Sequence, residues 1–148
     1  MREKDSIIED SGTYRGMDWA VRFRAMGFRC GYVRIEDEAL FEQYVKDFDE
    51  NNDVPSLDVH GGITFAEKLD DGNFFELSSG NWIGFDAAHW RDLNDYQSAR
   101  KYFGNKERYD SCEQICSRHP IQGASIKTKE YMVAECKSLI DQILGEEK

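Results

Sequence analysis

One stretch decides the predicted fold: Leu57-Asp58-Val59-His60-Gly61-Gly62-Ile63-Thr64-Phe65. Its odd positions are apolar or glycine, and its even positions carry Asp58, His60, Gly62 and Thr64. This two-residue period is typical of a β-strand with one face in a core and the other face free for chemistry. We therefore predict a strand over residues 57–65 whose polar face belongs to a functional site.

A second run repeats this arrangement downstream. In Asn81-Trp82-Ile83-Gly84-Phe85-Asp86 every second residue shares a face, and His89 follows three residues later. Glycine has no side chain to fill the space above a sheet. If the two strands are neighbours, Gly62 and Gly84 leave a hollow between them, and the residues expected at its rim are Asp58, His60, Trp82 and Asp86.

Further strands and helices surround this pair. Residues 17–24 and 28–35 alternate between apolar and polar side chains, which predicts an antiparallel hairpin. Apolar residues recur at helical spacing after Asp37 and after Thr128, and both residues are good helix caps. A further helix is expected over residues 108–118, where it stops before a proline.

The expected fold class is α+β. We predict a mostly antiparallel sheet of four to five strands with two to three helices packed on one face, all in a single domain over residues 13–145. Residues 1–12 are charged and are expected to be flexible. At 148 residues, with three Trp, seven Tyr and nine Phe, the chain is long enough to bury a core without disulfides.

The charge balance excludes some classes of partner. The formal net charge of −10 argues against binding to DNA, RNA or an anionic membrane surface, because each needs a dense positive footprint. No apolar run approaches the length of a membrane span. Basic residues nevertheless gather in the first hairpin region, at Arg15, Arg22, Arg24 and Arg29.

The chain has four cysteines, which we expect to be thiols in a reducing, cytoplasmic compartment. Cys112, Cys116 and His119 share one helical stripe with Ile115, and this stripe is interpreted as a buried helix face in preference to a zinc site.

Two carboxylate–imidazole pairs suggest chemistry at the predicted hollow. Asp58 with His60, and Asp86 with His89, offer the ligands that zinc, manganese or iron accepts, so these four residues are the candidate metal ligands. Without metal, His60, Asp86 and His89 are candidates for acid–base catalysis. A purely structural role for both histidines also remains open.

The arginines and aromatic residues favour a small anionic, nucleotide-type ligand over a polymer; the alternative for each arginine is that it balances acidic neighbours on an exposed sheet face. Guanidinium groups match phosphate bidentately, and aromatic faces stack on bases. The residues predicted to bind this ligand are Tyr14, Arg15, Arg29, Asp58, His60, Gly62, Thr64, Trp82, Gly84, Asp86 and His89.

Several strings resemble a group of small phage and prophage accessory proteins. They are Tyr14-Arg15-Gly16, the run Gly31-Tyr32-Val33, residues 58–65, Trp82-Ile83-Gly84-Phe85-Asp86-Ala87-Ala88-His89, and Val133-Ala134-Glu135-Cys136-Lys137-Ser138-Leu139. The chain departs from the group's pattern around His89, at Ala87 and Trp90-Arg91.

The resemblance implies a phage-encoded protein that acts in the cytoplasm of the bacterial host as an antagonist of host defence and sequesters a nucleotide signal. The alternatives are a metal-dependent hydrolase or phosphodiesterase and an inhibitor that binds another protein. Burial of aromatic side chains between subunits would allow a homo-oligomer.

Overall fold

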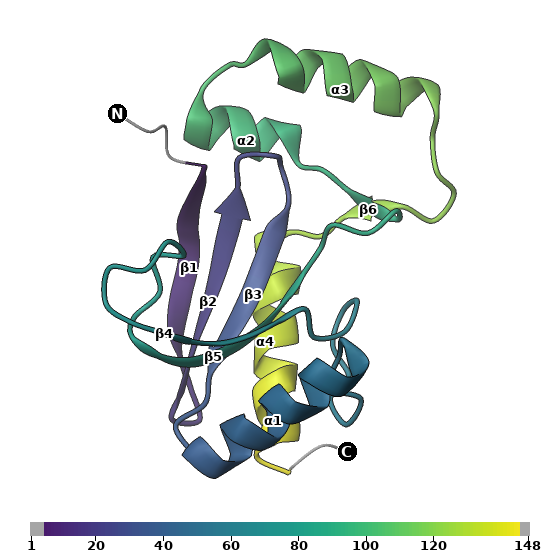
Figure 1. Ribbon diagram of the computed structural model, residues 1–148. Coiled ribbons are helices and arrows are strands. Elements are labelled where there is room, and N and C mark those ends of the chain that lie inside the picture. The colour runs from purple at the N-terminus through teal and green to yellow at the C-terminus, as the bar shows by residue number, and fades with distance from the viewer. Residues whose placement is uncertain (1–4, 146–148) are drawn as a thin grey trace.

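The computed structural model describes residues 5–145, which fold around one antiparallel sheet (Figure 1). Its strands run in the order β1-β2-β3-β5-β4. Their bounds are β1 Ser6–Tyr14, β2 Met17–Arg24, β3 Arg29–Arg34, β4 Phe65–Leu69 and β5 Gly80–Asp86. The described residues also form helices α1 Glu38–Asn51, α2 Tyr96–Phe103, α3 Glu107–Arg118 and α4 Lys129–Ile143, and a short parallel pair, β6 Asp92–Leu93 and β7 Ser125–Ile126. The predicted α+β class with a five-stranded antiparallel sheet is confirmed.

Helices α1 and α4 cover one face of the sheet and close the main core (Figure 1). The predicted caps hold, since Asp37 accepts a hydrogen bond from the Leu40 amide and Thr128 accepts one from the Tyr131 amide, both at 3.1 Å. Each cap satisfies a backbone donor that the first helical turn leaves free. The core residues on this face come from β2, β3, β5, α1 and α4 and include Trp19, Val21, Val33, Ile83, Phe85, Phe41, Tyr44, Met132, Cys136, Leu139 and Ile140.

The opposite face of the sheet is covered by the chain that connects β4 to β5, residues 70–79 (Figure 1). Leu77 from this connection, with Leu69 from β4, packs against Ala20 and Tyr32. Successive residues of a strand point to opposite faces, so the even-numbered residues of β2 lie on this side. This second layer also covers Arg22, whose guanidinium carbon lies 5.0 Å from the centre of the Phe75 ring.

Helices α2 and α3 lie at the end of the sheet near the β2–β3 turn (Figure 1). Phe23, Tyr96, Ala99 and Tyr109 form a small core there, and the Tyr109 hydroxyl donates to the Ala25 carbonyl at 2.8 Å. The chain leaves for α2 after β6 and returns at β7, and the pairing of these two strands closes this excursion at its base.

Two expectations about local structure are wrong. Residues 57–64 are not a strand, because Gly61 and Gly62 adopt φ of 70° and 82° and the Gly62 amide donates to the Val59 carbonyl in a turn. The alternation still marked burial, since Val59 and Ile63 are buried. The flexible segment expected over residues 1–12 is in β1 from Ser6 onward, and residues 1–4 lie outside the described residues.

All four cysteines are free thiols. Cys30 and Cys136 are buried, whereas Cys112 and Cys116 are exposed. The expected burial of this stripe is therefore wrong: Tyr109, which lies on the same face one turn earlier, is buried, but Cys112, Ile115 and Cys116 beyond it are exposed. Among the described helices, none combines the length and the apolar composition that a membrane crossing needs.

Candidate functional site

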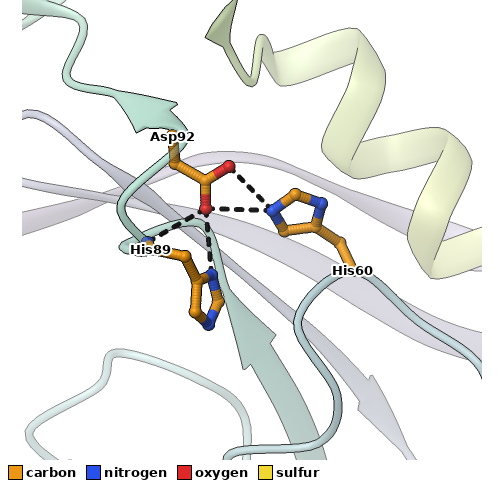
Figure 2. A group of neighbouring side chains, drawn as sticks. All are labelled: His60, His89 and Asp92. Atoms are coloured by element: carbon orange, nitrogen blue, oxygen red, sulfur yellow. Dashed lines mark hydrogen bonds and ion pairs between the residues drawn. The ribbon is translucent and has the colours of Figure 1, made fainter. Parts of the chain in front are cut away.

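Two histidines converge on one buried carboxylate (Figure 2). His60 Nε2 lies 2.9 Å from both oxygens of Asp92, and His89 Nδ1 lies 2.9 Å from Asp92 Oδ2. The Asp92 side chain is only 2% exposed, while those of His60 and His89 are 17% and 40% exposed. We call these three residues the His–Asp–His cluster.

Three separate segments place the cluster. Asp92 begins β6 and its amide donates to the His89 carbonyl at 2.8 Å, which folds the two residues onto each other. His60 lies in the turn before β4, and its amide donates to Glu135 of α4 at 2.8 Å. Gly61 packs directly on the His89 ring, and a Cβ at this position would collide with that ring.

The network around Asp92 stabilises its negative charge. Burial acts to raise the pKa of Asp92, but hydrogen bonds from His60, His89 and Lys127 outweigh burial and lower this pKa to about 2. Lys127 Nζ lies 3.2 Å from Asp92 Oδ1. The second nitrogen of His60, Nδ1, lies 2.9 Å from the Tyr131 hydroxyl, so both of its ring nitrogens have partners.

Asp86 joins the cluster to a pocket on the sheet. Its Oδ1 lies 3.8 Å from His89 Nε2, and its Oδ2 accepts a hydrogen bond from the Thr64 hydroxyl at 3.0 Å. Asp86 and Thr64 also line a cavity of about 140 Å³ on the face opposite α4. We call this cavity the sheet-face pocket, and its other lining residues are Arg22, Arg24, Cys30, Tyr32, Phe65, Phe75 and Phe85.

Arg22 is a buried cation in the wall of this pocket. Its side chain is 1% exposed, and it donates to the Ser6 hydroxyl at 2.8 Å and to the Tyr32 hydroxyl at 3.1 Å. Its Nη2 has no hydrogen-bond partner. Within residues 5–145, no carboxylate forms an ion pair with Arg22, whose other neighbours include the Phe75 ring at 5.0 Å.

Arg29 shows how this protein pairs a buried arginine. It is 4% exposed and makes two contacts with Glu9, at 2.6 Å and 3.0 Å, and a third with Asp95 at 3.0 Å. These carboxylates occupy the guanidinium fork that the sequence suggested for phosphate. The structure therefore gives Arg29 a structural ion pair in place of a ligand contact.

Three other predicted ligand residues lie away from the cluster. Arg15 forms an ion pair with Asp141 at 2.9 Å, and the Tyr14 hydroxyl donates to the same carboxylate at 3.5 Å. The backbone of Asp58 exchanges two hydrogen bonds with the Gln142 side chain, each at 2.7 Å. Asp92 takes the place in the cluster that Asp58 was expected to fill.

The expected hollow above the two glycines is filled. A Cβ at Gly84 would lie 2.7 Å from the Tyr32 ring, and one at Gly62 would lie 3.0 Å from the Asp53 carboxylate. Trp82 is buried, donates to the Ser78 carbonyl at 2.8 Å and borders a different cavity of about 340 Å³. The pocket thus lies beside the predicted hollow and retains Thr64 and Asp86 from the predicted set.

The sequence analysis missed Asp92, and it did not show that Arg22 would be buried without a carboxylate partner among the described residues. The spacing His89-x-x-Asp92 was a usable signal, since a turn can fold residues three apart onto each other. Arg22 carried no comparable signal, because its lack of a counter-charge depends on the partners that tertiary packing supplies.

Comparison of the chain with protein-family models, with curated proteins and with solved structures finds no significant match in any of the three.

Proposed function

We propose that the protein binds a small anionic ligand of nucleotide type, with one phosphoryl group held in the sheet-face pocket by Arg22 and Arg24. The observation that carries this proposal is the buried guanidinium of Arg22, which has a free Nη2 and no carboxylate partner among the described residues. A bound anion would supply the missing charge.

A buried charge without a counter-charge destabilises the folded protein. Moving a cation out of water costs several kcal/mol unless an anion and hydrogen bonds replace the lost hydration. The nearby Cys30 thiol and Tyr32 phenol do not provide that anion, because burial raises the pKa of each group. Both groups are therefore neutral at pH 7.

The charge of the pocket favours an anion even though the whole chain is acidic. Two arginines line the pocket against one carboxylate, Asp86, which is already engaged with Thr64. Charge-assisted hydrogen bonds to guanidinium act at short range, so they can hold phosphate where the long-range field opposes it.

The sheet-face pocket is too small to enclose a whole nucleotide. Its volume of about 140 Å³ is well below the ~300–1,000 Å³ of sites that enclose a whole drug-sized molecule. We propose that only a phosphoryl group enters and that the nucleoside part remains outside. The aromatic residues at this face, Phe65 and Phe75, offer apolar contact near the entrance.

The resemblance to phage accessory proteins supports a biological setting for this binding. In that setting the protein works in the host cytoplasm as an antagonist of host defence, where it sequesters a nucleotide signal. Sequestration needs affinity and no chemistry, which agrees with a pocket built from arginines.

Calorimetric titration in phosphate-free buffer tests the proposal, with inorganic phosphate, AMP and a cyclic dinucleotide as probes. Arg22→Met should weaken binding by roughly 10-fold to 150-fold, because a hydrogen bond to a charged group contributes about 1.5–3 kcal/mol. Arg118→Met, on the exposed end of α3, is the matched control and should bind as the parent protein does. Equal affinity of the two variants for these probes, or no binding of any probe to the parent protein, would contradict the proposal. Inhibition of another protein would then be the better-supported function.

A hydrolase is the second candidate function, and the position of Asp86 favours it. This carboxylate contacts the pocket through Thr64 and approaches His89 of the His–Asp–His cluster. A phosphoryl group in the pocket would thus lie near groups able to move a proton. Chromatography of the nucleotide probes after incubation separates the two functions, because a sponge returns intact ligand on heating and a hydrolase yields products.

A further inference from the structure

We infer that the His–Asp–His cluster is a site for one divalent transition-metal ion, with His60 Nε2, His89 Nδ1 and Asp92 Oδ2 as its ligands (Figure 2). The preferred ions are those that accept imidazole and carboxylate together, namely Zn²⁺, Mn²⁺ and Fe²⁺. The inference goes beyond anion binding, because the arginines of the sheet-face pocket do not require a metal.

The distances within the cluster suit such an ion. Bonds of about 2.0–2.2 Å to imidazole and carboxylate place the ligand atoms of a tetrahedral ion ~3.3–3.6 Å apart. In the cluster both imidazole nitrogens lie 2.9 Å from Asp92 Oδ2. All three ligand atoms lie within 4.8 Å of one another, so small side-chain rotations that lengthen the two contacts with Asp92 by about 0.4–0.7 Å would convert the hydrogen-bonded cluster into a coordination site.

The two oxygens of Asp92 have different partners, which allows Lys127 and a metal ion to share this carboxylate. Lys127 Nζ contacts Oδ1 at 3.2 Å, whereas Oδ2 faces both histidines and also accepts the His89 amide at 3.1 Å. Lys127 holds its place through further bonds to Ser125, at 2.7 Å and 3.1 Å. Asp92 is thus fixed on one side and open to a cation on the other.

The partner behind His60 fits metal ligation. A ligating histidine commonly donates its far N–H to an oxygen, which fixes the ring and its tautomer. His60 Nδ1 meets this condition with the Tyr131 hydroxyl at 2.9 Å, whereas His89 Nε2 faces Asp86 Oδ1 at 3.8 Å, which is beyond hydrogen-bond distance.

The charges that face the cluster favour a dication. Asp92 and Asp86 contribute negative charge, and Glu135 lies close enough to accept the His60 amide at 2.8 Å. Lys127 supplies one positive charge. Three carboxylates and one ammonium leave an excess of two negative charges, which a divalent cation neutralises.

Three protein ligands leave at least one coordination position open. Catalytic zinc sites have this pattern, with water or substrate in the remaining position. Because Asp86 borders both the cluster and the sheet-face pocket, an oxygen of a ligand held by Arg22 is the natural candidate for that position.

The test uses chelator-treated full-length protein titrated with Zn²⁺ and Co²⁺. Expected results are one bound equivalent by metal analysis and visible absorption bands of protein-bound Co²⁺. Asp92→Asn should weaken binding at least about 100-fold, because it removes the anionic ligand while it keeps the shape. His119→Ala, which alters the one histidine outside the cluster, is the matched control and should bind normally.

His89→Ala is the second variant, because the His89 ring is 40% exposed and its removal disturbs packing least. It should also lose the Co²⁺ bands while circular dichroism stays unchanged. Absence of stoichiometric binding of Zn²⁺, Co²⁺, Mn²⁺ and Fe²⁺ to the parent protein would overturn the inference, as would normal binding by His89→Ala. Arg22→Met should bind metal like the parent protein, which separates this test from that of the anion pocket.

Discussion

The same substitution should affect stability far more at the buried Arg29 than at the buried Arg22. Arg22 and Arg29 are 1% and 4% exposed, yet only Arg29 has carboxylate partners among the described residues. Methionine keeps much of the length of arginine and removes the charge. Arg22→Met and Arg29→Met therefore compare a buried charge without a counter-charge with one that has two.

The expected magnitudes follow from these contacts. Arg29→Met leaves Glu9 and Asp95 buried without their cation, and breaking a buried pair in this way costs about 3–5 kcal/mol. Arg22→Met loses the hydrogen bonds to Ser6 and Tyr32 but also removes an uncompensated charge. We expect these opposing effects to cancel to within about 1 kcal/mol.

Urea unfolding at pH 7 in phosphate-free buffer measures the free energy of unfolding of both variants. Tryptophan fluorescence reports the transition, because Trp19 and Trp82 are buried in the folded protein. For a chain of this size the loss in Arg29→Met corresponds to a melting temperature lower by roughly 6–20 °C. Added phosphate should stabilise the parent protein by about 2.7 kcal/mol at a hundred times its dissociation constant, and should stabilise Arg22→Met by only about 0.3–1.4 kcal/mol at the same concentration. An equal loss of stability in the two variants would refute the reasoning, because it would mean that Arg22 has a counter-charge within the protein.

Two further predictions concern the turn and the thiols. Gly61→Ala should destabilise the protein more than Gly72→Ala does. Both positions have positive φ, which costs an alanine about 1–2 kcal/mol. Only at Gly61 would the added Cβ also collide with the His89 ring. Equal losses in the two urea transitions would show that the turn does not hold His89. A thiol reagent at pH 8 should modify two cysteines at once and the other two only after unfolding, since burial raises the pKa of the Cys136 thiol to about 12. Immediate reaction of all four would contradict this burial pattern, in which the exposed pair is Cys112 and Cys116 and the buried pair is Cys30 and Cys136.

The parts of the fold that sequence predicted well are those set by local rules. Residues 17–24 alternate because one face of β2 packs on α4, and Asp37 and Thr128 cap their helices with short side chains. The error over residues 57–64 has a local cause as well. Two consecutive glycines at positive φ turn the chain, while the buried residues around them keep a spacing that resembles a strand.

The candidate site was predictable only in part, because its members come from separate segments. His60, Thr64, Asp86 and His89 belong to the predicted set and lie in the cluster or the pocket. The carboxylates that pair with Arg29 come from β1, which was expected to be flexible, and from the cap of α2. No spacing along the chain shows which arginine receives such partners, so Arg22 and Arg29 could not be told apart.

The position of Asp86 has a thermodynamic consequence. One of its oxygens accepts from Thr64 in the sheet-face pocket, and the other faces His89. An anion bound in the pocket repels this carboxylate and so alters its contact with His89, which would couple the two proposed sites energetically. Such coupling is reciprocal: whatever factor the anion applies to the affinity for metal, the metal applies to the affinity for the anion, and typical values of about 1–3 kcal/mol correspond to roughly 5-fold to 150-fold. A protein built in this way would respond most strongly when both species are present together.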